Sequence, residues 1–194
     1  MFEGPRYRIL LVNGPNLNLL GEREPEHYGR VTLAQIVATC RRRAAQRQAV
    51  IVDFQSNHEG AIIDFLHRER RRAHGLVINP GAYTHTSYAI RDAITACRYR
   101  AWEVHLSDLT RRAVREPFRA VSVIADVCEG RVMGRGARGY LDALDGLLDR
   151  LGAPPWYQPH VKVGIALPRA GRIELDDVAP REPAAPARSR RRPW

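Results

Sequence analysis

The sequence contains almost no lysine. Thirty of its 31 basic residues are arginine, and Lys162 is the single lysine. Enzymes that form an imine with a carbonyl substrate need a lysine amine in the catalytic domain. Lys162 falls in a C-terminal stretch outside the predicted domain, so the composition argues against Schiff-base chemistry.

Cysteines and long apolar runs are also scarce. The three cysteines, Cys40, Cys97 and Cys128, are an odd number and lie far apart, which argues against a disulfide framework and a thiolate metal site. The histidines lack metal-ligand spacing, and no stretch reaches the ~20 consecutive apolar residues of a membrane-spanning helix. The N-terminal residues contain no signal-peptide core. We therefore expect a cytoplasmic protein with no metal and no membrane association.

Positive charge is in excess. The chain has 31 basic and 21 acidic residues, for a net charge of +10. Such a balance raises the question of nucleic-acid binding. Residues 151–194, however, contribute +4 of this charge from eight basic and four acidic residues. An arginine bias together with a basic tail explains the excess better than a nucleic-acid surface does.

Short apolar runs alternate with longer segments of helical periodicity. Strands are predicted over residues 8–12, 49–54, 75–79, 101–106 and 120–125, and helices over 32–48, 61–73, 87–97 and 139–151. This alternation is typical of right-handed βαβ units. It predicts the α/β class, with a flavodoxin-like, doubly wound, five-stranded parallel sheet of order 2-1-3-4-5.

This domain is expected to cover residues 6–152, followed by a C-terminal extension. Residues 153–194 are rich in proline and arginine. The stretch 161–175 is compatible with a small hairpin, and the remaining tail has the composition of a disordered segment. The G-x-G-x-x-G pattern at 134–139 precedes the last helix and has no following strand to supply a ribose-binding acid, so we expect no dinucleotide cofactor.

Polar residues gather where each of the first four predicted strands ends. They are Asn13, Asn16 and Asn18; Gln55, Asn57, His58 and Glu59; Asn79, Tyr83, Thr84 and His85; and Glu103, His105 and Ser107. Turn chemistry accounts for any one of these clusters. Ligands of open parallel sheets, however, bind beyond the carboxyl ends of the strands. Four clusters at that edge predict a small-molecule site.

The fourth strand offers a candidate general acid. Glu103, His105 and Ser107 are spaced i, i+2, i+4 and therefore share one face of an extended strand. A carboxylate beside an imidazole fixes its tautomer and stabilises its protonated form, which suits an acid. A hydrogen-bonded polar pair at a strand end is the alternative interpretation.

The loop over residues 21–30 has the features of a mobile lid. It is long and charged, it is bounded by Gly21 and Gly29, and it contains Arg23 and Tyr28. A tyrosine that acts as a base near neutral pH needs a lowered pKa, which nearby guanidinium groups supply. An exposed surface loop is the alternative interpretation of this segment.

Four stretches in this order carry a family resemblance: LLVNGPNLNLLGEREPEHYG, FQSNHEG, VINPGAYTHTSYAIRDA and EVHLSD. They closely resemble the type II 3-dehydroquinate dehydratases, over residues 8 to about 150. The resemblance implies a flavodoxin-like fold, no metal or cofactor, and a homododecamer built of trimers. It also implies dehydration of 3-dehydroquinate to 3-dehydroshikimate in the shikimate pathway.

The resemblance assigns roles to individual residues. Tyr28 would be the base that removes a proton from C2, with Arg23 holding its phenolate. Asn16 would hold the water that stabilises the enolate, and His105, oriented by Glu103, would protonate the departing C1 hydroxyl. The substrate-binding residues implied are Asn79, His85, Asp92, Leu106, Ser107 and Arg119. In the family, the aspartate matching Asp92 reaches the site from a neighbouring subunit.

The chain departs from the family pattern after the histidine strand. The segment SDLTRRAVREPFR is about three residues longer than usual, with the insertion within 108–114. By spacing Arg112 fills the first arginine position of the family, and by context Arg115 does; Arg119 fills the second. The usual His-Ser pair is Val121-Ser122 in this chain.

Two other functions stay open at this point. The altered segment 108–123 is compatible with a paralogue that acts on an amino-substituted dehydroquinate in secondary metabolism. The basic tail is compatible with a non-catalytic flavodoxin-like module that binds nucleic acid.

Overall fold

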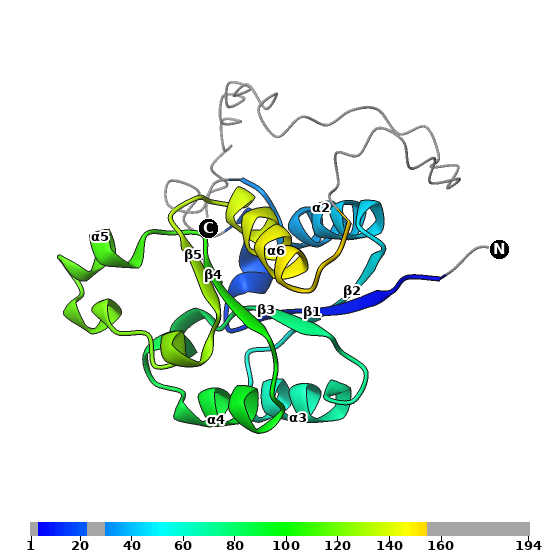
Figure 1. Cartoon of the computed structure of the whole chain (residues 1–194). Helices are drawn as coiled ribbons and strands as arrows, with labels where there is room; N and C mark the ends of the chain where they lie inside the picture. The colour runs from blue at the N-terminus through cyan, green and yellow to red at the C-terminus, as the bar shows by residue number, and fades with distance from the viewer. Residues whose placement is uncertain (1–3, 23–29, 155–194) are drawn as a thin grey trace, which may run out of the picture. The chain divides into compact units, whose positions relative to one another are not determined.

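The computed structural model describes residues 4–22 and 30–154. Its core is a five-stranded parallel sheet of order β2-β1-β3-β4-β5 (Figure 1). The strands are β1 (Tyr7–Asn13), β2 (Ala49–Gln55), β3 (Gly75–Asn79), β4 (Ala101–His105) and β5 (Gly130–Met133). The fold class and the strand order predicted from the sequence are confirmed. The hairpin expected over 161–175 lies outside the described residues.

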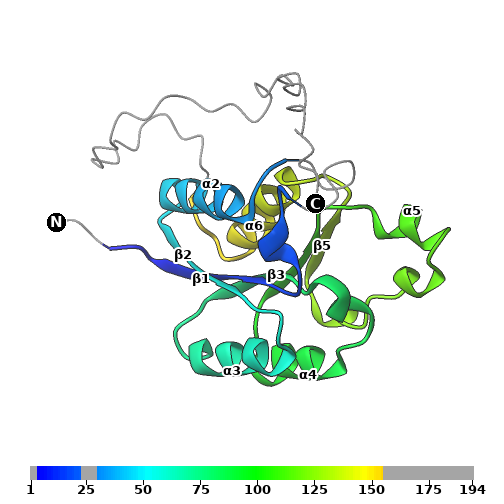
Figure 2. The same ribbon diagram turned by 180° about the vertical axis from the view of Figure 1, so that it is seen from behind.

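Helices cover both faces of the sheet. Helices α2 (Leu33–Gln46) and α6 (Arg138–Arg150) lie on one face, and α3 (Glu59–Glu69) and α4 (Tyr88–Ala96) lie on the other (Figures 1 and 2). The shorter elements are α5 (Leu109–Ala113) and the 3-10 turns η1 (Leu17–Leu19), η2 (Gly81–His85), η3 (Pro117–Ala120) and η4 (Ala125–Val127).

The central strand β1 is apolar on both sides. Ile9 and Leu11 pack into a cluster with residues of α2 and α6, whereas Leu10 and Val12 pack with residues of α3 and α4. All four side chains are buried. A parallel sheet covered on both faces has no solvated face, so its central strands consist mainly of apolar residues.

The fifth strand differs from the prediction. The strand expected over 120–125 is wrong, because β5 is Gly130–Met133 and pairs with Trp102–His105 of β4. Gly130 suits this place, since a Cβ there would lie 2.6 Å from the Trp102 ring. The apolar run AVSVIA gave a stronger strand pattern than GRVM. It instead crosses between η3 and η4, where the Val123 N–H donates to the Thr84 carbonyl (2.9 Å).

A buried arginine fixes the end of α6. Arg47, directly after α2, has only 1% of its surface exposed. Its guanidinium donates to the Asp145 and Ala153 carbonyls (both 3.1 Å), to the Pro154 carbonyl (2.9 Å) and to the Asp149 carboxylate (2.6 Å). A buried cation is tolerated only with such a full set of partners.

Replacing Arg47 is expected to destabilise the fold. In Arg47→Met the buried carbonyls of residues 145, 153 and 154 lose their donor, so the free energy of unfolding should fall by about 2–4 kcal/mol in urea denaturation. Arg41→Met is the matched control. Arg41 pairs with Asp53 at the surface with 58% of its side chain exposed, and such pairs contribute less than about 1 kcal/mol. Equal losses in the two variants would contradict the structural role of Arg47.

Candidate active site

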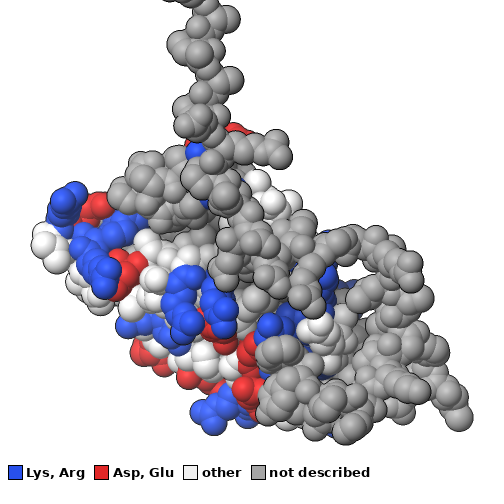
Figure 3. All heavy atoms as spheres, turned by 90° about the horizontal axis from the view of Figure 1, so that it is seen from above, with Lys and Arg blue, Asp and Glu red and all other residues white. Residues whose placement is uncertain are grey.

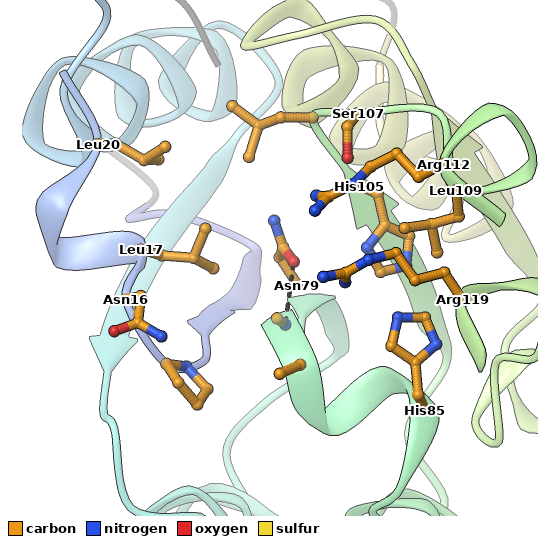
Figure 4. Close-up of a pocket in the computed structure, with 14 residues that line it drawn as sticks. Asn16, Leu17, Leu20, Asn79, His85, His105, Ser107, Leu109, Arg112 and Arg119 are labelled. Carbon is orange, nitrogen blue, oxygen red and sulfur yellow. Dashed lines mark hydrogen bonds between the residues drawn. The ribbon is translucent and has the colours of Figure 1, made fainter. Parts of the chain in front are cut away.

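A pocket opens at the carboxyl ends of β1, β3 and β4. Asn79 and His105 are the last residues of β3 and β4, and the turns that follow the three strands complete the walls (Figure 4). The lining residues are Pro15, Asn16, Leu17, Leu20, Asn79, Gly81, Ala82, His85, His105, Leu106, Ser107, Leu109, Arg112 and Arg119. A mixture of apolar walls and a few convergent polar groups is typical of a small-molecule site.

The structure brings together most of the residues that the sequence singled out. Those lining the pocket are Asn16, Asn79, His85, His105, Leu106, Ser107 and Arg119. Glu103 lies behind His105 and is fully buried. Arg23 and Tyr28 lie outside the described residues. Asp92, on α4, does not line the pocket of its own chain, and 76% of its side chain is exposed.

The first wall depends on an unusual backbone conformation at Asn16. This residue has φ 64° and ψ 0°, in the left-handed region that asparagine tolerates better than most side chains. Its N–H donates to the Asn57 side-chain oxygen (2.9 Å), and Gln55 donates to the same oxygen (3.1 Å). The loop after β2 therefore holds the loop after β1, which aims the Asn16 side chain into the pocket (Figure 4).

The histidine of β4 rests on a buried carboxylate. His105 Nε2 donates to Glu103 Oε1 over 2.6 Å, with no part of Glu103 exposed. Ser122 Oγ donates to the same Glu103 oxygen over 2.7 Å. Because Glu103 holds Nε2, Nδ1 is the ring nitrogen that remains to exchange a proton with a ligand. Sequence reasoning did not single out Ser122 as a partner of Glu103, since the two are far apart in the chain and belong to different elements.

His85, in the turn η2, is held as a neutral ring. Its Nδ1 faces the Val121 carbonyl at 2.6 Å, and a carbonyl only accepts, so Nδ1 carries the hydrogen. Burial lowers the pKa of His85 below the ordinary imidazole value. The other nitrogen, Nε2, is then a hydrogen-bond acceptor, and it is buried without a protein partner among the described residues. This arrangement suits a ligand hydroxyl.

Two arginines supply positive charge. Arg112 and Arg119 both line the pocket, and Glu116 lies between them, 3.4 Å from Arg112 and 2.7 Å from Arg119. The hydrogen bond from Arg119 lowers the pKa of Glu116, which keeps its carboxylate ionised. Arg115, the competing candidate for the first arginine position, is exposed and does not line the pocket. The geometry favours the assignment by spacing, to Arg112.

The segment that carries these arginines owes its shape to a cap. Asp108 accepts hydrogen bonds from the N–H groups of Thr110 (2.9 Å) and Arg111 (3.3 Å), and this begins α5. The hydrogen bond from the Thr110 side chain lowers the pKa of Asp108. Helix α5 was not predicted, because five residues are too few for a clear helical period.

Many arginines elsewhere in the described part of the chain pair with a carboxylate. Figure 3 shows one face on which arginine groups alternate with carboxylates rather than gathering into one basic surface. Ion pairs of the described residues include Arg41 with Asp53, Arg135 and Arg138 with Asp142, and Arg100 and Arg150 with Glu129. Such interleaved charge is typical of a solvated surface.

The part of the chain that the structure describes, residues 4–22 and 30–154, offers neither a metal site nor a membrane-spanning helix. No three histidine, cysteine, aspartate or glutamate side chains of that part of the chain gather around a common point. No helix there is long and apolar enough to cross a bilayer.

Comparisons with known proteins agree with this geometry. The family model described as dehydroquinase class II matches residues 7–148. The 3-dehydroquinate dehydratase of Roseiflexus castenholzii is 51% identical over 148 residues, which are 76% of this chain and 92% of that protein. The catabolic 3-dehydroquinase 1 of Neosartorya fischeri is 49% identical over 137 residues, 71% and 89% of the two chains.

A solved structure gives the same result in three dimensions. The type II dehydroquinase of Butyrivibrio crossotus superposes with a TM-score of 0.70 at 43% identity, covering 74% of this chain and 99% of that one. With a family model spanning 7–148 and a pocket built at the expected edge of the sheet, the chain belongs to the class II dehydroquinase family.

Proposed function

We infer that the chain is a 3-dehydroquinate dehydratase of the type II class, which converts 3-dehydroquinate to 3-dehydroshikimate and water in the shikimate pathway. The observation that carries this inference is the buried Glu103–His105 pair at the floor of an arginine-bearing pocket. Family membership supplies the reaction, and the pair supplies the acid that the reaction needs.

The reaction removes the elements of water across C1 and C2. A base takes the proton from C2, next to the C3 ketone, and the electron pair of that C–H bond moves onto the carbonyl oxygen as an enolate. The enolate then re-forms the ketone while the C1–O bond breaks, and the leaving hydroxyl takes a proton to depart as water. Both steps develop charge, so a base, an enolate stabiliser and an acid are all required.

His105 fits the acid step. Its Nδ1 is not engaged by Glu103, which holds the ring through Nε2 and so orients Nδ1 for donation. Asn16, which lines the same pocket, would hold the water that stabilises the enolate. Tyr28 and Arg23 would supply the base and the cation that keeps its phenolate ionised.

The remaining lining groups match an anionic substrate with several hydroxyls. Arg119 and Arg112 offer guanidinium donors to a carboxylate or hydroxyl. Neutral His85 accepts from a hydroxyl, and Asn79 and Ser107 offer amide and hydroxyl partners. Leu106 supplies an apolar wall. No cofactor enters the mechanism.

Assembly would complete the site. Asp92 is exposed on α4, away from the pocket of its own chain, as a residue that serves a neighbouring subunit would be. Its neighbour Arg91 pairs with Asp126 (2.6 Å) and also lies 3.6 Å from the Asp92 carboxylate. We propose a homododecamer built of trimers, in the cytoplasm.

Direct assay tests the function. Purified protein mixed with 3-dehydroquinate should give a rise in ultraviolet absorbance from the conjugated enone of the product. An amino-substituted dehydroquinate run in parallel addresses the paralogue, and a higher kcat/KM for that compound would replace the proposed substrate. If the oligomer is intact and neither compound gives an absorbance rise, the hypothesis of a non-catalytic binding module is the one that remains.

Removing the proposed base should abolish most turnover. Tyr28→Phe is expected to lower kcat by roughly 10²–10⁴-fold, the usual contribution of a positioned general base, without changing the oligomeric state. Tyr7→Phe, at the opposite end of β1, is the control and should keep normal turnover. Near-normal kcat in Tyr28→Phe would remove Tyr28 from the mechanism.

The Ser122 hydroxyl, which donates to Glu103, should affect turnover rather than substrate binding. Ser122 does not line the pocket, so Ser122→Ala is expected to leave KM within about twofold and to lower kcat about tenfold, as loss of one hydrogen bond to a charged group implies. Ser122→Thr retains the hydroxyl and should restore kcat. If alanine and threonine variants behave alike, the hydroxyl does not position the acid.

A further inference from the structure

A chain of hydrogen bonds runs from the helix layer to the pocket. The Tyr140 hydroxyl, on α6, lies 2.7 Å from Asn13 Oδ1 and 2.9 Å from Asn79 Nδ2. Asn79 Oδ1 accepts from the Gly81 N–H at 3.2 Å, the bond drawn in Figure 4. Asn13 and Asn79 are opposite each other in the register of β1 and β3. The three side chains are 0–3% exposed.

The Gly81 end of this series of hydrogen bonds fixes which atom donates in each of them. The Gly81 N–H can only donate, so the Asn79 atom facing it is the oxygen and the amide nitrogen faces Tyr140. The Tyr140 oxygen therefore accepts from Asn79, and its own hydrogen is donated to Asn13. Burial raises the pKa of Tyr140, so the phenol keeps the hydrogen that this arrangement needs.

Packing alone does not call for a tyrosine at this position. Phenylalanine would fill the same space without placing a hydroxyl in a site that water does not reach, where an unpaired polar group costs free energy. The two partners of the hydroxyl are both asparagines at the ends of neighbouring strands, and one of them lines the pocket.

We propose that Tyr140 is a positioning residue for substrate binding. It accepts one of the two amide hydrogens of Asn79, while Gly81 holds the amide oxygen, so the second amide hydrogen is presented to the pocket in one orientation. Tyr140 lies outside the lining of the pocket, so its hydroxyl acts through Asn79. This inference rests on the proposed function, because it names how the same site binds 3-dehydroquinate.

The test compares two buried tyrosines. Tyr140→Phe should raise the KM for 3-dehydroquinate about tenfold and change kcat by less than about threefold. Tyr99→Phe is the matched control, since the Tyr99 hydroxyl is also buried and donates to the Leu66 carbonyl (2.6 Å) among α3 and α4 residues. It should lose similar thermal stability and keep KM within twofold.

A double-mutant cycle separates positioning from a general structural effect. In an Asn79→Ala background the amide is absent, so adding Tyr140→Phe should change KM by less than twofold. An unchanged KM in the single Tyr140→Phe variant, or the same tenfold rise in the Asn79→Ala background, would overturn the proposal. If Tyr140→Phe does not fold, Asn13→Leu removes the acceptor of the same hydroxyl. It should raise KM in the same way, and an unchanged KM there overturns the proposal.

Calorimetric titration of the wild-type protein with 3-dehydroquinate distinguishes failure of the proposed function from failure of the proposed role of Tyr140. Binding without turnover would refute the proposed function alone, and the Kd values of the variants would then take the place of KM. Neither binding nor turnover would refute both. Turnover in the wild type with no effect in Tyr140→Phe would refute only the role of Tyr140.

Discussion

The site is organised around a carboxylate that has no access to water. A buried carboxylate needs hydrogen-bond donors. Glu103 receives two on Oε1, from His105 Nε2 and Ser122 Oγ, whereas Oε2 has no partner among the described residues. These two hydrogen bonds hold the His105 ring on β4. They also hold Ser122 beside Glu103, although Ser122 belongs to the segment between η3 and η4. The neighbouring Val121 carbonyl fixes His85 as well. One short segment thus sets the geometry of both histidines.

The departure from the family pattern at 121 leaves these contacts in place. The contact that Val121 makes with His85 comes from its backbone, which any residue supplies. The neighbouring Ser122 acts through its side chain, and the hydroxyl is present. A change of side chain at 121 therefore alters the surface, where 58% of Val121 is exposed, while the hydrogen bonds to His85 and to Glu103 stay available.

Sequence reasoning reached the fold and the edge of the sheet, because both follow from local pattern. Buried strands such as Gly75–Asn79 are continuous apolar runs, and the polar residues directly after them must meet at the carboxyl edge. The misplaced fifth strand shows the limit, since the apolar run at 120–125 packs Val123 and Ile124 without pairing as a strand. Contacts between distant segments had no local signal: Ser122 with Glu103, and Tyr140 with two asparagines. That Arg112 lines the pocket and Arg115 does not depends on the path of α5, which a five-residue helix does not reveal in advance.

Glu116 has a consequence for the end of the catalytic cycle. It already occupies donors of Arg112 and Arg119, so the pocket holds less net positive charge than its two arginines suggest. Substrate and product of the proposed reaction carry the same carboxylate, and an interaction equally strong with both lowers KM without speeding the chemistry. In the proposed site, Glu116 would compete with the substrate carboxylate for these guanidinium groups. This competition would favour release of the product, and the hydroxyl and amide groups would then distinguish substrate from product.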